Sequence, residues 1–209
     1  MTRTYEPVEA ADAEVVGLLA NSALAVMTRL AKDGDQAPSI TAHVAHARMS
    51  ARAFRHFEEI ELWAQHRGLD LLEVAGRFED LFDDLDARTR PARWSERSVK
   101  TYVTVGIFGD LLNEVTRAHG LFADHDTDWD LGQGEWAMEH LQPTIAQDPQ
   151  VAARLSLWAR RVAGEVLGLV RSTLFTHPAL LSDPDEVDAV VEKVTKCHGQ
   201  RMADLGLQA

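Results

Sequence analysis

The sequence contains one cysteine, Cys197, among 209 residues. A single cysteine excludes an intramolecular disulfide and a metal site built from several cysteines, and it is typical of a reducing compartment. The sequence also lacks the apolar N-terminal run of a signal peptide. No stretch approaches the roughly 18 uninterrupted apolar residues of a membrane-spanning helix. We therefore expect a cytoplasmic protein that is not inserted in a membrane.

Basic residues are in the minority. The chain has 33 acidic and 21 basic residues, and its formal net charge is −12. Nucleic-acid binding requires clustered Lys and Arg, so we expect no nucleic-acid partner. Two local basic clusters, residues 88–97 and 160–161, are interpreted as solvated helix ends. The length suits one hydrophobic core, which predicts a single domain over residues 1–209.

No run of alternating apolar and polar residues bounded by turns indicates a β-strand, whereas helical periodicity covers nearly the whole chain. The predicted fold class is all-α. The expected elements are long helices over residues 12–31, 39–66, 95–119 and 127–146, a short crossing segment over 70–89, and two additional C-terminal helices over 149–176 and 183–206. This order predicts a four-helix bundle with additions.

Local signals mark several helix ends. Ser39 and Asp148 are expected to be N-caps, and Asp70 with Glu73 forms a capping-box pattern. The helix over 127–146 is weakened by two glycines and a proline, Gly132, Gly134 and Pro143. We therefore expect a kink or a late start there.

Five stretches together resemble the actinobacterial ferritin-like family that is related to the tRNA hydroxylase acting on methylthio-isopentenyladenosine. They are GLLANSAL (17–24), HFEEI (56–60), SVKTYVTVGIFGDLL (98–112), DPQVAARLSLWARRVAGEVL (148–167) and HGQRMADLGL (198–207). The similarity runs from about Glu14 to Leu207 with little need for gaps. It implies a ferritin-like bundle that holds two iron ions through carboxylates and two carboxylate-x-x-His motifs.

The resemblance assigns the metal ligands to six positions of this chain. These are Ala23, Ala53, His56, Val105, Asp130 and Gln133. Three expected carboxylates are thus replaced by alanine or valine, and only His56 and Asp130 remain as competent ligands. Because two metal ions in an apolar core need several carboxylates for charge compensation, we expect no normal di-iron oxygenase and no cofactor, with iron as the minor alternative.

The leading hypothesis is that the vacated bundle centre binds a small organic ligand. Its predicted pocket consists of Ala23, Met27, Met49, Ala53, His56, Val105, Phe108, Trp129, Gln133 and Trp136. If the protein is an enzyme, the expected chemistry is metal-independent isomerisation or cyclisation. His56 would then be the acid or base, and Asp130 would orient it or raise its pKa.

Two alternatives belong to other classes. One is a non-enzymatic dimeric structural or regulatory protein whose centre is simply packed, and a homodimer is the expected assembly. The other is a metal-dependent hydroxylase or oxygenase with a non-standard site. For the latter, a displaced site could use His46, His56 and a carboxylate such as Asp110 or Glu114, although two histidines about 15 Å apart along a helix cannot share one ion.

Other titratable residues receive simpler interpretations. His43 and His46 are expected at the surface or at a helix end. His198, Arg201 and Met202 match the family's C-terminal pattern, and we expect them on a helix surface or at an interface. The acidic run at 124–130 does not fit the calcium loop of an EF-hand and is interpreted as an acidic helix start.

Overall fold

The computed structural model describes residues 8–122, 129–181 and 183–209. Within these ranges the regular elements are helices, and no β-strand occurs. The long helices are α1 (Ala10–Asp35), α2 (Ile40–His66), α5 (Trp94–Ala118), α8 (Pro149–Thr176) and α9 (Val187–Leu205). The short elements are α3 (Leu71–Gly76), α4 (Asp83–Arg88), α6 (Gln133–His140), α7 (Gln142–Gln147), η1 (Pro178–Leu180) and η2 (Pro184–Glu186). The all-α prediction is confirmed.

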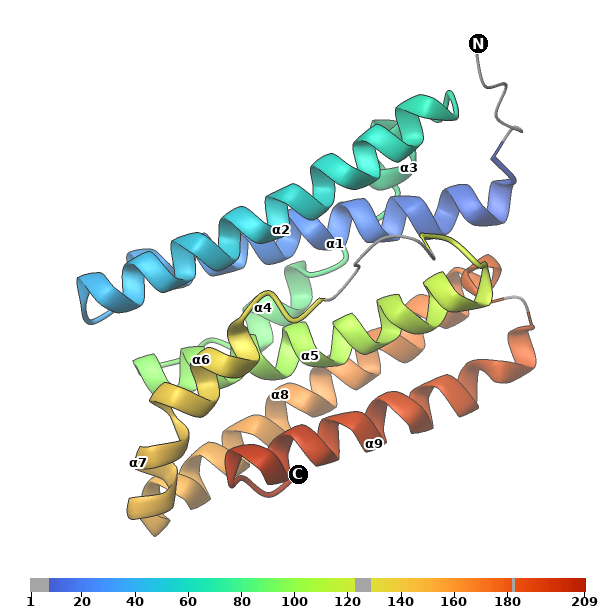
Figure 1. Cartoon of the computed structure of the whole chain (residues 1–209). Helices are drawn as coiled ribbons and strands as arrows, with labels where there is room; N and C mark the ends of the chain where they lie inside the picture. The colour runs from blue at the N-terminus through green and yellow to red at the C-terminus, as the bar shows by residue number, and fades with distance from the viewer. Residues whose placement is uncertain (1–7, 123–128, 182) are drawn as a thin grey trace.

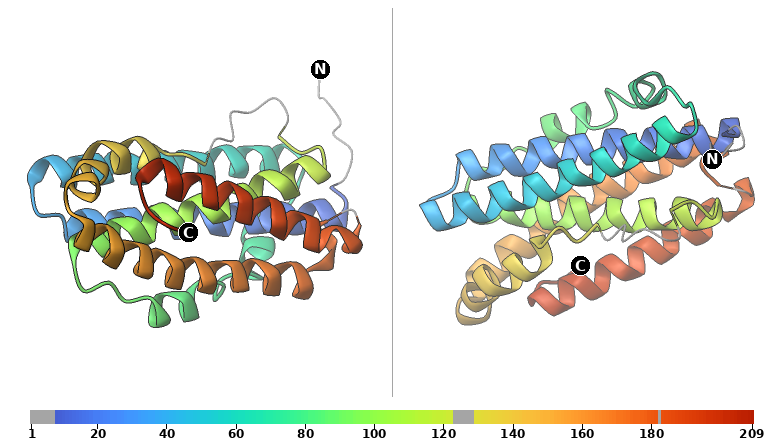
Figure 2. Two further views of the ribbon diagram at one scale, coloured as in Figure 1. Left: turned by 90° about the horizontal axis from the view of Figure 1, so that it is seen from below. Right: turned by 45° about the horizontal axis from the view of Figure 1, so that its top comes forward.

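The long helices form three layers, with α1 and α2 on one side, α5 in the middle, and α8 and α9 on the other side (Figure 1). α5 packs against α1, α6, α8 and α9, and most of its side chains are buried. A helix that is apolar around most of its circumference belongs in the interior. The turned views in Figure 2 show α3 and α4 as short pieces outside the long helices.

The predicted N-caps are confirmed. The Ser39 hydroxyl accepts a hydrogen bond from the Ala42 amide, and the Asp70 carboxylate accepts one from Glu73. Asp148 accepts from the amides of Gln150 and Val151. These caps satisfy first-turn N–H groups that have no partner inside the helix, so local sequence is enough to predict them.

The predicted helix over residues 127–146 is wrong as a continuous element. Residues 127 and 128 lie outside the described residues, and α6 begins only after Gly132, whose φ of +97° is left-handed. A second break follows His140, and Pro143 stands in the first turn of α7. Proline cannot continue a helix interior, because it lacks an N–H and its ring clashes with the preceding turn. The expected late start is therefore confirmed, and the break is sharper than a kink.

The C-terminal motif anchors α9 against α5. Arg201 forms two bonds to the Asp110 carboxylate, at 3.0 and 2.6 Å. Its guanidinium crosses α5 where Gly106 leaves room, because a Cβ at Gly106 would lie 2.6 Å from Arg201 Nε. His198 and Met202 are buried, which corrects the expectation of a surface position for these two residues.

α1 is long and apolar enough to cross a membrane by length and composition. In the fold, 56% of that apolar window is buried inside the protein. A core helix of a soluble protein has the same composition, so this arrangement supports the expectation of no membrane insertion. The cytoplasmic location stays a prediction.

Candidate functional site

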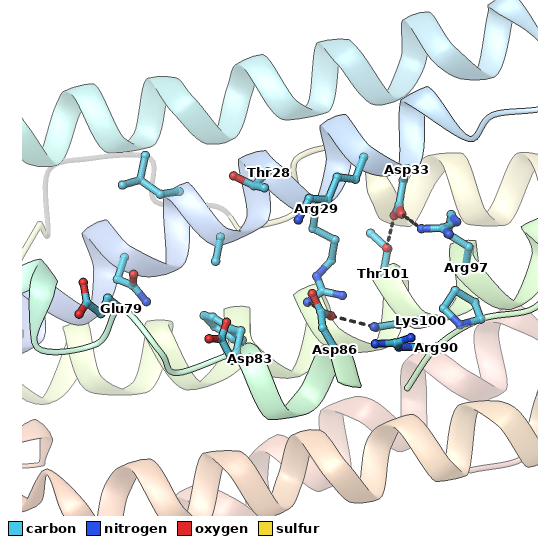
Figure 3. Close-up of a pocket in the computed structure, with 16 residues that line it drawn as sticks. Thr28, Arg29, Asp33, Glu79, Asp83, Asp86, Arg90, Arg97, Lys100 and Thr101 are labelled. Carbon is cyan, nitrogen blue, oxygen red and sulfur yellow. Dashed lines mark hydrogen bonds and ion pairs between the residues drawn. The ribbon is translucent and has the colours of Figure 1, made fainter. Parts of the chain in front are cut away.

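A pocket of about 540 Å³ opens between α1, α4 and α5 (Figure 3). We call it the outer pocket. Charged side chains line its walls, namely Arg29, Lys32, Asp33, Glu79, Asp83, Asp86, Arg90, Arg97 and Lys100, and apolar groups from Leu24, Ala25, Phe82 and Pro91 complete it. Its volume lies in the range of small-molecule sites.

Asp86 holds two cations at the centre of the outer pocket. Its carboxylate lies 2.7 Å from an Arg29 nitrogen and 2.8 Å from Lys100 Nζ. The side chains of Arg29 and Lys100 are only 12% and 7% exposed, whereas that of Asp86 is 52% exposed. Two largely buried cations therefore share one half-exposed carboxylate, and this part of the pocket carries excess positive charge.

Burial and charge shift the pKa values of this group. Burial lowers the pKa of Lys100, and the bond to Asp86 opposes that shift. Burial by itself would raise the pKa of Asp86, but the nearby Arg29 and Lys100 outweigh it and lower the pKa. The lowered pKa of Asp86 favours the ionised carboxylate that the ion pairs need.

Asp33 forms the far wall of the pocket. Its carboxylate is buried, accepts a hydrogen bond from Arg97 at 3.1 Å, and also accepts one from the Thr101 hydroxyl. A buried carboxylate is tolerated when charged and polar partners satisfy it. Asp33 therefore fixes the end of α1 against the start of α5 and holds Arg97 at the pocket.

The outer pocket has a basic end and an acidic end (Figure 3). Arg90 lies near Lys100, and neither Arg90 nor Lys32 forms an ion pair with any residue that the structure describes. Glu79 and Asp83 lie toward the opposite end. The separation suits a ligand with an anionic group that binds at the basic end, where cations outnumber carboxylates.

A narrow apolar slot adjoins the outer pocket between α1 and α5. We call it the inner slot. Its wall consists of Ser22, Ala25, Val26, Arg29, Phe82, Thr104, Val105, Phe108, Gly109, Leu112 and Trp129. Ala25, Arg29 and Phe82 line both spaces. The Phe82 ring meets the Phe108 ring edge-on at 4.8 Å, so Phe82 stands between pocket and slot.

Three buried polar groups at the inner slot have no hydrogen-bond partner among the residues that the structure describes. They are the hydroxyls of Ser22 and Thr104 and the indole N–H of Trp129. In native proteins most buried polar atoms form a hydrogen bond, so three buried polar atoms without one on the same slot call for an explanation. The free volume is about 10 Å³, which is room for about one water molecule. The slot is thus nearly closed but carries unused hydrogen-bonding capacity.

The structure brings part of the predicted pocket together. Val105, Phe108 and Trp129 line the inner slot. The ring of His56 meets Trp129 edge-on at 5.4 Å, but His56 does not line the slot. Ala23 and Ala53 are fully buried core residues. The role of His56 as a proton-transfer group stays a prediction.

Other predicted pocket residues lie elsewhere. Met27 lines a separate groove between α1 and α2. Met49 and Trp136 line a pocket between α2 and α6. Trp136 stacks on His140 at 4.7 Å and meets His46 edge-on at 4.8 Å. His46 is therefore buried, contrary to the expected surface or end position, and burial lowers its pKa.

Asp130 and Gln133 bind backbone groups around the start of α6. Asp130 is exposed and accepts hydrogen bonds from the amides of Gly132 and Gly134. The Gln133 side chain accepts from the Leu131 amide and donates to the Trp129 carbonyl. Both side chains thus shape the turn that carries Trp129, while the action of Asp130 on His56 stays a prediction.

The residues at the six positions that the resemblance assigns to metal ligands do not provide the donor set of a di-iron centre. Ala23, Ala53 and Val105 have no donor atom, and the Gln133 amide is occupied by its two backbone bonds. Among the described residues, no group of three or more His, Cys, Asp or Glu side chains could hold a metal ion.

Sequence reasoning missed the outer pocket, although one signal for it was present. Lys100 stands within the run Ser98–Phe108, where apolar and small residues dominate, and a lysine among core positions is almost always paired. Its partner Asp86 lies in a different element, which the sequence does not reveal. Ser22 and Thr104 give no signal, because both are common in helices.

Comparison with known proteins identifies the family of the fold. A family model described as "Ferritin-like domain, actinomycetes" matches residues 6–182. The matched region includes α1 to α8, and with them every residue of the outer pocket and the inner slot. No curated protein matches the chain significantly.

Proposed function

The chain belongs to the ferritin-like domain family of actinomycetes, and we propose that it uses this scaffold to bind a small amphipathic organic anion. The anionic group would bind at the basic end of the outer pocket, and the apolar body would enter the inner slot past Phe82. The observation that carries the proposal is a pocket with a basic end that adjoins an apolar slot, with Ala25, Arg29 and Phe82 lining both. We also propose that the chain is related to the tRNA hydroxylase that acts on methylthio-isopentenyladenosine.

Each half of the site supplies a different part of the recognition. Arg29 and Lys100 already bind the half-exposed carboxylate of Asp86, so their geometry also suits the carboxylate or phosphate group of a ligand. The slot supplies apolar walls and a few polar groups that fix orientation, as small-molecule sites usually do. Since the slot is nearly closed, entry of the ligand requires the Phe82 ring to turn aside.

Decanoate, decylamine and acetate serve as probes in isothermal titration calorimetry. Decanoate has both an anionic group and an apolar chain, so we expect it to bind with one molecule per chain. Decylamine lacks the negative charge and acetate lacks the apolar body, so both should bind far more weakly. Equal binding of decanoate and decylamine, or no binding of decanoate, would contradict the proposal.

Replacing Lys100 with methionine should lower the affinity for decanoate by about tenfold, because a charge-assisted hydrogen bond is worth roughly 1.5 kcal/mol or more. The matched control is Arg88→Met. Arg88 pairs with Asp84 and Glu165 and does not line the outer pocket. The control should bind decanoate as the wild type does. A K100M protein that is folded by circular dichroism and binds normally would rule out this head-group site.

Thr104→Val should stabilise the protein and leave decanoate binding unchanged, because the alkyl chain in the slot forms no hydrogen bond with the hydroxyl. Valine has the shape of threonine without the hydroxyl, and an unsatisfied buried hydroxyl costs about 1 kcal/mol. Urea denaturation should therefore show a free energy of unfolding raised by about 1 kcal/mol. Thr173→Val is the control: its buried hydroxyl donates to the Leu169 carbonyl, so its removal should destabilise instead. Destabilisation by T104V would show that its hydroxyl is already satisfied.

A further inference from the structure

α2 carries a second apolar stripe on the side away from the core. Its buried stripe includes His46, Met49, Ala53 and Ile60. The exposed stripe consists of Ile40, Val44, Ala47, Ala51 and Phe54, which follow one another at intervals of four and three residues. Ile40 is 75% exposed, and Val44 and Phe54 are about 40% exposed. This spacing is the seam by which one helix packs against another.

A groove runs beside this stripe. It lies between α1 and α2, has a volume of about 350 Å³, and is lined by Met27, Ala31, Ala47, Ala51 and Phe54 among others. Small alanine side chains let a second helix approach closely, and Phe54 projects at the edge of the groove. The surface thus offers both a protruding aromatic side chain and a hollow that could receive one.

Charge is divided along the same face of α2. Arg48 lies in the N-terminal half of α2, Arg55 lies just past its midpoint, and Glu58 and Glu59 follow in the C-terminal half. All four side chains are exposed, and none of them forms an ion pair with another described residue. In a chain with net charge −12, this basic segment stands beside an acidic one on one helix.

We propose that a second copy of this chain packs on this face, with the two α2 helices antiparallel. A two-fold axis near residue 53 sets Arg48 of one copy opposite Glu58 of the other, and Val44 opposite Leu62. The two Phe54 side chains then meet near the axis and enter the facing grooves. A parallel pairing would instead bring arginine to arginine and glutamate to glutamate, which costs free energy.

Other exposed apolar side chains do not form such a surface. Leu72, Leu157 and Phe175 are more than 60% exposed, but they lie on different elements. Single exposed apolar residues are normal on soluble proteins, whereas a contiguous stripe beside a groove marks an interaction site. The charges on this face of α2 complement those of the same face in an antiparallel copy, so we infer that the partner is a second copy of this chain.

Sedimentation equilibrium of the full chain tests the proposal. We expect the wild type to have twice the mass of one chain and Phe54→Glu to have the mass of one. Phe175→Glu, at a site on α8 that is 82% exposed, is the control and should remain dimeric. A monomeric wild type, or a dimer that survives F54E in a protein that is folded by circular dichroism, overturns the proposal.

Charge reversal tests the antiparallel orientation. Arg48→Glu and Glu58→Arg should each weaken the dimer by about tenfold or more, because each places like charges opposite one another. The double variant R48E/E58R should restore dimerisation toward the wild-type level. A double variant that is as weak as the single ones would contradict this pairing.

Discussion

Replacing Gly17 with alanine is expected to lower the free energy of unfolding by about 3 kcal/mol, the upper end of the usual cost of overpacking. Gly17 is buried in α1, where the backbone of α3 crosses it. A Cβ at this position would lie 2.4 Å from the Val74 carbonyl oxygen and 2.7 Å from the carbonyl carbon. Both atoms belong to the backbone, so α3 itself has to move away.

Two opposing effects decide the sign of this change. Alanine is better than glycine in a helix interior by about 1 kcal/mol, which favours the variant. Displacement of α3 exposes Leu71 and Val74, which are buried against the core, and this loss is larger. Urea denaturation followed by circular dichroism measures the difference.

Gly168→Ala is the matched control. Gly168 lies inside α8, is exposed, and no atom of the described residues outside its own stretch of helix lies within 4 Å of its Cβ position. Here only helix propensity acts, so stability should rise by roughly 0.5–1 kcal/mol. A G17A variant as stable as G168A would contradict the close crossing of α1 and α3. The G17A variant should also bind decanoate more weakly, because the segment after α3 carries Phe82 and Asp86.

The second large effect is a loss of stability in acid that arises from His198. Burial lowers the pKa of His198 to about 4, and the charge of Arg201 adds to this shift. The Nδ1 atom of His198 is also buried, and it has no hydrogen-bond partner within the described ranges. In the unfolded chain the pKa returns to its ordinary value of 6.5.

The direction of the pH effect follows from proton binding. Between pH 6.5 and about 4 the unfolded chain binds a proton at His198 and the folded chain does not. Lowering the pH through this window therefore favours unfolding, and the effect levels off below about pH 4. Since one pKa unit corresponds to about 1.4 kcal/mol, the total loss is about 3 kcal/mol. Burial also lowers the pKa of His46, which acts in the same direction.

Urea denaturation at a series of pH values measures this loss. His198→Leu should remove most of the decline below pH 6.5, because leucine fills similar space and does not titrate. His43→Gln, at an exposed position on α2, should leave the part of the decline that His198 causes unchanged. A decline of equal size in H198L would assign the acid sensitivity to other groups.

The sequence predicted the fold where local chemistry decides it. The caps at Ser39, Asp70 and Asp148 were predicted correctly, because a cap depends on neighbours within a few residues. The break between α6 and α7 was only partly predicted, since Gly132 and Pro143 signal a disturbance without fixing its position. His46 was misplaced because Trp94 and Trp136, which cover it, come from distant segments.

The candidate site was less predictable for the same reason. Val105, Phe108 and Trp129, three of the predicted pocket residues, line the inner slot; helical spacing turns Val105 and Phe108 inward, whereas Trp129 precedes α6. Ligand binding by these residues stays a prediction. The ionic groups of the outer pocket are separated widely in sequence, with Arg29 and Asp86 joined across 57 residues. The hydrophobic periodicity of a sequence does not predict such an ion pair, because Arg29 and Asp86 come together only when α4 packs near α1.

The alanine and valine side chains in the bundle centre also bear on how this protein folds. A centre lined with carboxylates repels itself until metal ions arrive, so the folded fraction of such a bundle varies with the metal supply. Ala23, Ala53 and Val105 carry no charge and are fully or almost fully buried. These three side chains therefore need no metal ion to compensate their charge when the helices pack together.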